Sequence, residues 1–124
     1  MKLLFKFTTA FLFTMLTIAA SAQANLDIDD FVKIYKSTPN SQLLDVRTPN
    51  EWSGGKLANS VCVDYLSESF SQGVAKFDKD KPVFVYCAVG GRSAKASKVL
   101  KDAGFKQIYN LKGAGYSQLK AKGL

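Results

Sequence analysis

The chain has 124 residues, which is enough for one domain with a single hydrophobic core. Its formal net charge is +7, but no long basic run or mixture of basic and aromatic residues indicates nucleic-acid binding. We interpret the basic excess as a soluble surface that also attracts small anions. With no histidine and only two cysteines, the chain excludes Ser-His-Asp and Cys-His catalysis, histidine-bound metals and a four-cysteine zinc site. We therefore expect neither a metal site nor a cofactor.

The start of the chain has the pattern of a secretory signal peptide. Two lysines precede an apolar stretch at residues 7–20, and small residues then lead to the motif AQA just before Asn25. An uncleaved membrane anchor is the alternative, but the stretch is shorter than the roughly 20 residues that span a bilayer. We expect residues 1–24 to be a signal peptide and residues 25–124 to form an exported domain, periplasmic or secreted, without stable membrane insertion.

Helix and strand patterns alternate through the first half of the expected domain. Apolar residues at helical spacing in 28–35 predict a helix capped by Asp27, and the turn "TPNS" follows it. Residues 42–46, "QLLDV", form an apolar run typical of a strand. Thr48 then starts a short helix, because threonine can cap it, proline suits its first position and glutamate follows three residues after the cap.

The same alternation continues to the end of the chain. The segment "SVCVDY" reads as a second buried strand, "PVFVY" as the most β-rich and central strand, and the helix that follows ends at Gly104. Strands are expected at 60–65, 82–86 and within 105–111, and helices at 66–77, 92–103 and within 115–123. This order predicts an α/β domain with a mostly parallel central sheet and helices on both faces.

The segment "YCAVGGRSAKA" joins the central strand to a helix and carries the most specific chemical pattern. Cys87 lies at the carboxyl end of the strand, where parallel sheets bind ligands. Gly90 and Gly91 allow a sharp turn with inward amides, and the helix that starts at Arg92 or Ser93 adds its positive end. Without histidine, these groups must stabilise a Cys87 thiolate. The alternative is that Cys87 is a small core residue.

Cys62 has a different setting. It lies between Val61 and Val63 within an expected buried strand, and no glycine or arginine is near it in the sequence. We interpret it as a buried structural thiol. A resolving cysteine or a disulfide partner for Cys87 is the alternative in an exported chain.

Two segments resemble those of single-domain rhodaneses, a family of thiosulfate sulfurtransferases. "LLDVRTPNEW" at 43–52 is similar to the first signature of that family, and residues 85–113 resemble its active-site region, with the loop pattern C-x-x-G-x-R-S from Cys87 to Ser93. The resemblance covers nearly the whole expected domain. It implies a rhodanese-like three-layer fold with about five strands.

The resemblance also implies a function. Cys87 would accept a sulfane sulfur as a persulfide from a small anionic donor, thiosulfate or a polysulfide, and pass it to a thiol or cyanide. The loop amides would hold the persulfide, Arg92 would attract the donor, and three residues would support the site. The loop residues are Ala88, Val89, Gly90, Gly91 and Arg92, and the supporting residues are Asp45, Arg47 and Ser93.

Two departures from the family pattern concern the pocket wall. Residues 55–60 read "GKLANS" where Gly-His-Ile-Pro-Gly-Ala is usual, so Lys56 replaces a histidine. Residues 113–116 carry one extra residue, and Leu119 stands where a tryptophan is usual.

Two other functions use the same cysteine. One is a non-enzymatic persulfide carrier that serves a partner protein. The other is a cysteine phosphatase, whose loop places arginine six positions after cysteine, whereas Arg92 is five positions after Cys87.

Overall fold

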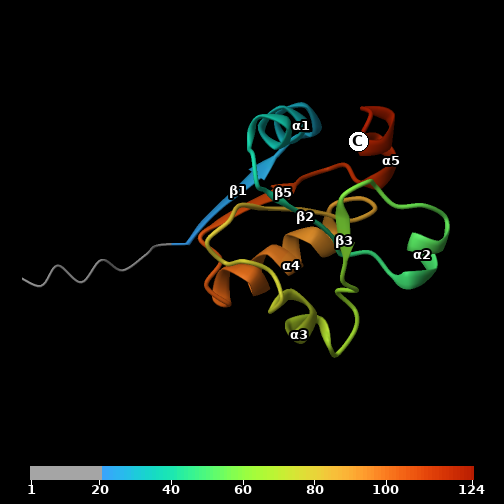
Figure 1. Ribbon diagram of the computed structural model, residues 1–124. Coiled ribbons are helices and arrows are strands. Elements are labelled where there is room, and N and C mark those ends of the chain that lie inside the picture. The colour runs from blue at the N-terminus through green and yellow to red at the C-terminus, as the bar shows by residue number, and fades with distance from the viewer. Residues whose placement is uncertain (1–20) are drawn as a thin grey trace, which may run out of the picture.

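The computed structural model describes residues 21–124, so the basic and apolar parts of the expected signal peptide lie outside the described residues. Five strands and five helices alternate in this range (Figure 1). The strands are β1 (Ala22–Leu26), β2 (Gln42–Asp45), β3 (Ser60–Cys62), β4 (Val83–Tyr86) and β5 (Gln107–Leu111). The helices are α1 (Ile28–Ser37), α2 (Pro49–Ser53), α3 (Phe70–Val74), α4 (Gly91–Asp102) and α5 (Tyr116–Ala121).

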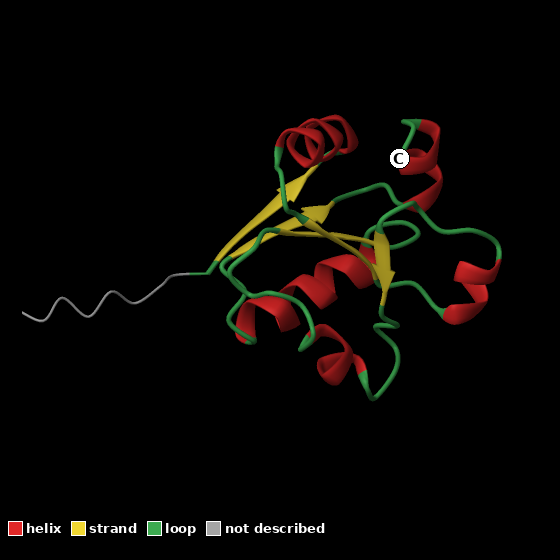
Figure 2. Cartoon of the chain, in the orientation of Figure 1, coloured by secondary structure: helices red, strands yellow, loops and turns green. Residues whose placement is uncertain are grey.

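The strands form one parallel sheet in the order β1-β5-β4-β2-β3. Helices α1 and α5 cover one face of the sheet, and α3 and α4 cover the other (Figure 2). The predicted α/β class, parallel sheet and three layers are therefore confirmed. The strand β4 lies in the middle of the sheet with all four of its residues buried, as the sequence predicts.

Local capping signals correctly predict where several helices begin and end. Asp27 accepts a hydrogen bond from the Asp30 amide at 3.0 Å and caps α1. Thr48 and Glu51 form the expected capping box of α2. Gly104 follows α4 with a φ of +94°, the left-handed conformation that ends a helix and favours glycine.

The strand β1 is not predicted from the sequence. Its residues, "AQANL", have no apolar run, and they form a strand because all five pair in parallel register with β5. The expected cleavage point before Asn25 lies inside β1. That cleavage and the boundary at residue 24 stay predictions.

The segment from Ser60 to Phe77 differs from the prediction. The strand β3 ends at Cys62 and lies at the edge of the sheet, so Val61 is 50% exposed rather than buried. The expected helix at 66–77 shortens to α3, and Leu66 is 66% exposed. The Leu66 amide donates to the Asp64 carboxylate at 2.9 Å, a local bond that competes with helix formation.

Candidate active site at the carboxyl end of the sheet

Cys87 follows the last residue of β4 and is fully buried. It belongs to the apolar cluster between the sheet and helices α3 and α4, together with Val85 and Ala96. The central strand therefore positions the thiol at the carboxyl end of the sheet, directly before the N-terminus of α4.

The loop after Cys87 turns back over the sulfur. The Gly90 amide donates a hydrogen bond to the Cys87 Sγ at 3.1 Å. Gly90 has a φ of +101°, which an L side chain rarely adopts, and a Cβ there would come 3.0 Å from the Gly113 amide nitrogen. The adjacent Val89 is 77% exposed at the top of the loop. Glycine at position 90 therefore allows an amide to point at the sulfur.

The surroundings of Cys87 favour the thiolate. Burial on its own raises the pKa of the thiol, but hydrogen bonds from Ser93 and from the Val89 and Gly90 amides outweigh burial, so the pKa is lowered. A lower pKa increases the thiolate fraction at neutral pH, and the thiolate is the nucleophilic form.

Ser93 connects this loop to the neighbouring strand. Its side chain is buried, and its hydroxyl group donates to the Gly90 carbonyl at 3.1 Å, with the Leu111 carbonyl at 3.4 Å. One hydroxyl proton cannot serve both carbonyls and the sulfur fully, so in this geometry Ser93 mainly fixes the loop. Turning the hydroxyl toward a thiolate would add to the lowered pKa of Cys87.

Arg92 points to α2 and forms a bidentate ion pair there. Its Nη1 and Nη2 atoms lie 2.6 and 3.0 Å from the two carboxylate oxygens of Glu51. The hydrogen bond from Arg92 lowers the pKa of Glu51 to about 2. The sequence predicts Glu51 only as part of the α2 capping box, and the structure adds this second role, which no local pattern indicates. The expected attraction of an anionic donor by Arg92 stays a prediction.

Asp45 and Arg47 form a buried network behind the site. The Asp45 carboxylate accepts hydrogen bonds from the Arg47 Nε and Nη2 atoms and from the Tyr86 hydroxyl group, at 2.8–3.0 Å. Arg47 also donates to the Gly55 carbonyl at 2.8 Å and lies 4.0 Å from the centre of the Tyr116 ring. Asp45 pairs with Tyr86 in the sheet and shares its face, opposite to that of Cys87. The two residues therefore support the strand ends without bonding to the thiol.

The loop before α5 packs directly on the cysteine loop. The Tyr116 amide donates to the Cys87 carbonyl at 2.9 Å. Gly115 approaches so closely that a Cβ would collide with the backbone of Cys87 and Ala88. This segment carries the extra residue relative to the family pattern. Its two glycines, Gly113 and Gly115, are the signal in the sequence that indicates close backbone contact.

The two other departures lie outside the thiol's immediate contacts. Leu119 is fully buried and fills the apolar cluster between α1, α5 and the sheet. Lys56 is exposed, and its charge contributes to the environment of Cys62.

The structure separates the two cysteines. Cys62 pairs with Asp45, which pairs with Tyr86, so two strand spacings, about 10 Å, separate the backbones at this level. Cys62 also points to the opposite face of the sheet from Cys87. A disulfide needs Cα atoms less than about 7 Å apart, so the two do not form one in this fold. Both are free thiols, and Cys62 is half-buried rather than fully buried, with a pKa raised first by burial.

Within residues 21–124, no group of three or more cysteine, aspartate and glutamate side chains is placed to hold a metal ion. None of the helices in that range combines the length and the apolar character that a bilayer span requires.

Comparison with known proteins identifies a family. The model of the rhodanese-like domain matches residues 27–122. The uncharacterized protein YqhL of Bacillus subtilis is 39% identical over 75 residues, which are 59% of this chain and 56% of that protein. The chain thus spans about half the length of that relative. A chloroplastic thiosulfate sulfurtransferase of Arabidopsis thaliana is 36% identical over 92 residues, covering 65% of this chain and 75% of the relative.

Solved structures share the fold. A rhodanese-related protein from Thermoplasma volcanium is 28% identical with a TM-score of 0.64, and the match covers 78% of this chain and 91% of that one. A protein from Rhodopseudomonas palustris, described as of unknown function and a possible tyrosine phosphatase, is 27% identical with a TM-score of 0.66, covering 86% of both chains.

Proposed function

This chain belongs to the rhodanese-like domain family, and from that membership we propose that it is a sulfurtransferase that carries sulfur as a persulfide on Cys87. The observation that carries the proposal is the Gly90 amide 3.1 Å from the Cys87 Sγ, in a loop that lowers the pKa of the thiol without a histidine. Sulfurtransferase relatives support the general chemistry, and the donor and acceptor below are part of the proposal.

In the first step, the Cys87 thiolate attacks the outer sulfur of an anionic donor such as thiosulfate. An S–S bond forms between Cys87 and that sulfur, the S–S bond of the donor breaks, and sulfite leaves with its electron pair. The enzyme then holds a persulfide anion. The amides around the Cys87 loop and the N-terminus of α4 stabilise its negative charge, as they stabilise the thiolate.

In the second step, the anion of an acceptor attacks the outer sulfur of the persulfide. A thiolate acceptor becomes a persulfide, cyanide becomes thiocyanate, and the Cys87 thiolate leaves with the electron pair of the broken bond. The enzyme returns to its starting state, so the two steps form a ping-pong cycle.

A non-enzymatic persulfide carrier is the second candidate. The observation in its favour is the complete burial of Cys87, which would shield a persulfide from solvent until a partner protein collects it. Multiple turnovers with thiosulfate and cyanide distinguish the enzyme from the carrier.

Phosphatase activity is less well supported. The Cys87 loop is one residue shorter than a phosphatase loop, and both terminal nitrogens of Arg92 are engaged by Glu51 rather than free for a phosphate. Because one structural neighbour is described as a possible tyrosine phosphatase, the test below also measures hydrolysis of an aryl phosphate.

The test is the intact mass of the protein after incubation with thiosulfate or polysulfide. We expect a gain of one sulfur atom, which Cys87→Ser abolishes and the control Cys62→Ser retains. Thiocyanate should then appear on addition of cyanide. The proposal fails if the folded protein gains no sulfur from either donor and instead hydrolyses an aryl phosphate.

Export is a separate part of the proposal and depends on the sequence alone. The two lysines, the apolar stretch at 7–20 and the small residues before Asn25 support a cleaved signal peptide and a periplasmic or secreted domain. Sequencing of the N-terminus from the native host tests it, and an intact Met1 would contradict it.

A further inference from the structure

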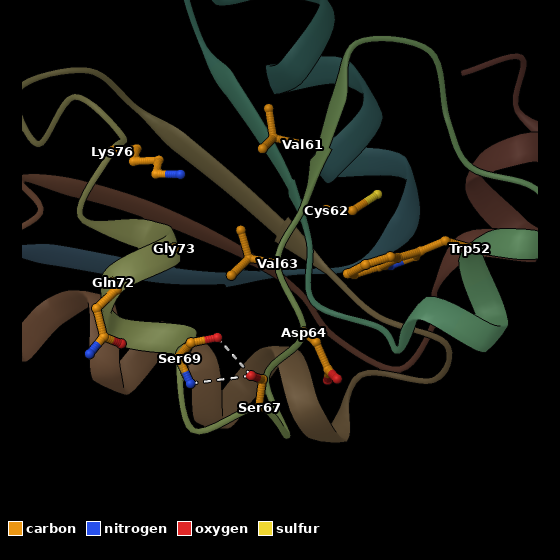
Figure 3. Close-up of a pocket in the computed structure, with 10 residues that line it drawn as sticks. All are labelled: Trp52, Val61, Cys62, Val63, Asp64, Ser67, Ser69, Gln72, Gly73 and Lys76. Carbon is orange, nitrogen blue, oxygen red and sulfur yellow. Dashed lines mark hydrogen bonds between the residues drawn. The ribbon is translucent and has the colours of Figure 1, made fainter.

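The open edge of β3 lies in a groove that the proposed sulfur transfer leaves unexplained. Within residues 21–124, β3 pairs only with β2, so its other side faces no strand. Two pockets of about 440 and 380 Å³ lie along this edge and share Val61 and Lys76. Figure 3 shows β3 between Gly73 and Gln72 of α3 on one side and Trp52 of α2 on the other. We call these two pockets together the edge groove.

The backbone of β3 offers hydrogen-bonding groups to the edge groove. The Val63 amide donates to the Asp45 carbonyl at 2.9 Å, so Val63 directs its backbone groups toward β2. Because successive residues of a strand direct these groups to opposite sides, the N–H and C=O of Cys62 face the groove. An unpaired edge of this kind is a template for another strand.

The side chains give the groove an apolar centre and one charge of each sign, Lys76 in both pockets and Asp64 in the larger one. Val61 is half exposed at the point where the two pockets meet. Lys76 lines both pockets and forms no ion pair with any residue of 21–124. At the end of the groove near the carboxyl end of β3, the lining includes Trp52 and Asp64.

We propose that the edge groove binds an extended, acidic segment of another polypeptide, which adds as a strand beside β3. The Cys62 backbone groups would pair with the segment, Val61 would contact an apolar side chain, and Lys76 would pair with a carboxylate. β3 itself spans about 10 Å, and the lining of the groove continues from Asn59 to Asp64, so a segment of about six residues covers it.

Charge favours this occupant over a second copy of the chain. Each chain has a formal net charge of +7, or +5 without the two lysines of the expected signal peptide, so two copies repel each other. An acidic segment is attracted to the basic chain and supplies a carboxylate that can pair with Lys76.

The position of the groove also suggests what the bound segment does. Trp52, at one end of the groove, follows Glu51, which holds Arg92 at the start of the Cys87 loop. A segment that leaves the groove at this end therefore approaches the loop. The bound segment would thus anchor a protein that accepts sulfur from Cys87. This role rests on the proposed function, whereas the binding of the segment to the groove does not.

The binding test uses an acetylated and amidated six-residue peptide of alternating valine and glutamate, with a valine–lysine peptide as its control. Titration calorimetry should show the acidic peptide binding at least about tenfold more tightly at low salt. Hydrogen exchange of the Cys62 amide should slow in the complex, because that amide becomes paired. Equal affinities for the two peptides, or an unchanged Cys62 amide, would overturn the proposal.

Two variants locate the contact. Lys76→Glu should weaken binding of the acidic peptide by about fivefold or more, whereas the matched control Lys33→Glu, at an exposed position of α1, should not. Cys62→Pro removes the outward N–H, which an edge strand tolerates, and should abolish binding while Cys87 still gains sulfur from thiosulfate. If Cys62→Pro does not fold, the Lys76→Glu comparison decides. Concentration-dependent protection of the Cys62 amide without peptide would show a second copy in the groove and contradict the acidic segment.

Discussion

Glu51 shows how one side chain can serve two elements. It completes the capping box of α2 through Thr48, and it holds both terminal nitrogens of Arg92 at the start of α4. The two residues are 41 positions apart, so the pair fixes the distance between α2 and the Cys87 loop. An Arg92 that is held in this way has a defined orientation, which a free surface arginine lacks.

The variant Glu51→Gln tests this pair through pH dependence. Glutamine can still cap α2, so the change removes mainly the charge that pairs with Arg92. The pKa of Glu51 falls from 4.5 to about 2 on folding, so the pair stabilises the fold above pH 4.5 and is lost as the pH falls toward 2. Urea unfolding measures the free energy of unfolding at pH 6 and at pH 3. The difference between these two values should be smaller in Glu51→Gln than in the unmodified protein, by about 0.5–1 kcal/mol.

The control for this variant is Glu68→Gln, which removes an exposed carboxylate without an ion pair among residues 21–124. It should keep the pH dependence of the unmodified protein. The same pH dependence in Glu51→Gln would show that the pair contributes nothing.

Ser93→Ala tests the hydrogen bonds around the thiol. Removing the hydroxyl group takes away one group that favours the thiolate and loosens the loop that holds the Gly90 amide, so the pKa of Cys87 should rise. The ultraviolet absorbance of the thiolate, titrated in a Cys62→Ser background, measures this pKa. Sulfur uptake at neutral pH should fall and recover at higher pH. An unchanged titration would assign Ser93 a purely structural role.

At the scale of elements, the loop between β5 and α5 is part of the site. Gly115 brings its backbone against that of Cys87 and Ala88, and the Tyr116 amide bonds to the Cys87 carbonyl. The Cys87 loop is therefore in contact with the β5–α5 loop as well as with α4. Its shape depends on two loops that are far apart in the sequence.

Gly115→Ala should disturb this packing severely. The added Cβ meets backbone atoms that cannot move without displacing the Cys87 loop, so we expect a loss of stability of about 2 kcal/mol or more and a larger loss of sulfur transfer. Gly91→Ala is the matched control, because a Cβ there meets nothing within 4 Å and the residue begins α4. Unfolding curves and persulfide formation measure both effects. Equal behaviour of the two variants would contradict the role of Gly115.

Local signals explain what the sequence predicted at this scale. Asp27, Thr48 and Gly104 mark helix ends by chemistry that acts within a few residues, and α1, α2 and α4 begin or end where they indicate. The motif from Cys87 to Ser93 likewise lies in one segment. In contrast, β1 exists only through its pairing with β5. The helix expected at 66–77 is shortened to α3, because the bond from the Leu66 amide to Asp64 competes with the first turn of that helix.

At the scale of the whole molecule, the candidate site is assembled at the carboxyl ends of β2, β4 and β5. The pair between Glu51 and Arg92 and the contact between Gly115 and Cys87 join segments that no pattern in the sequence relates. The exposure of Val61 and the half-buried state of Cys62 follow from the place of β3 at the sheet edge. Strand order decides these features, and the sequence predicts strands more readily than their order.

The other edge of the sheet gives a prediction that joins stability to the expected export. Cleavage before Asn25 would remove three of the five β1 residues and leave Asn25 and Leu26 in register with Asn110 and Leu111. The Asn110 side chain donates to the Asn25 side chain at 3.0 Å, so the remaining pair keeps one contact beyond the backbone. The shortened chain should therefore fold with a weaker edge.

We expect a protein that starts at Asn25 to unfold with a free energy about 1–3 kcal/mol lower than one that starts at Ser21. The shorter protein lacks the hydrogen bonds that pair Ala22 to Ala24 with β5, each of which contributes about 1 kcal/mol. Urea unfolding of the two proteins measures the difference. Sulfur uptake by Cys87 should be the same in both, because residues 22–24 pair with residues 107–109, at the end of β5 that lies away from the site. Equal stability would show that the first half of β1 contributes nothing to the fold, and that export could remove it without cost.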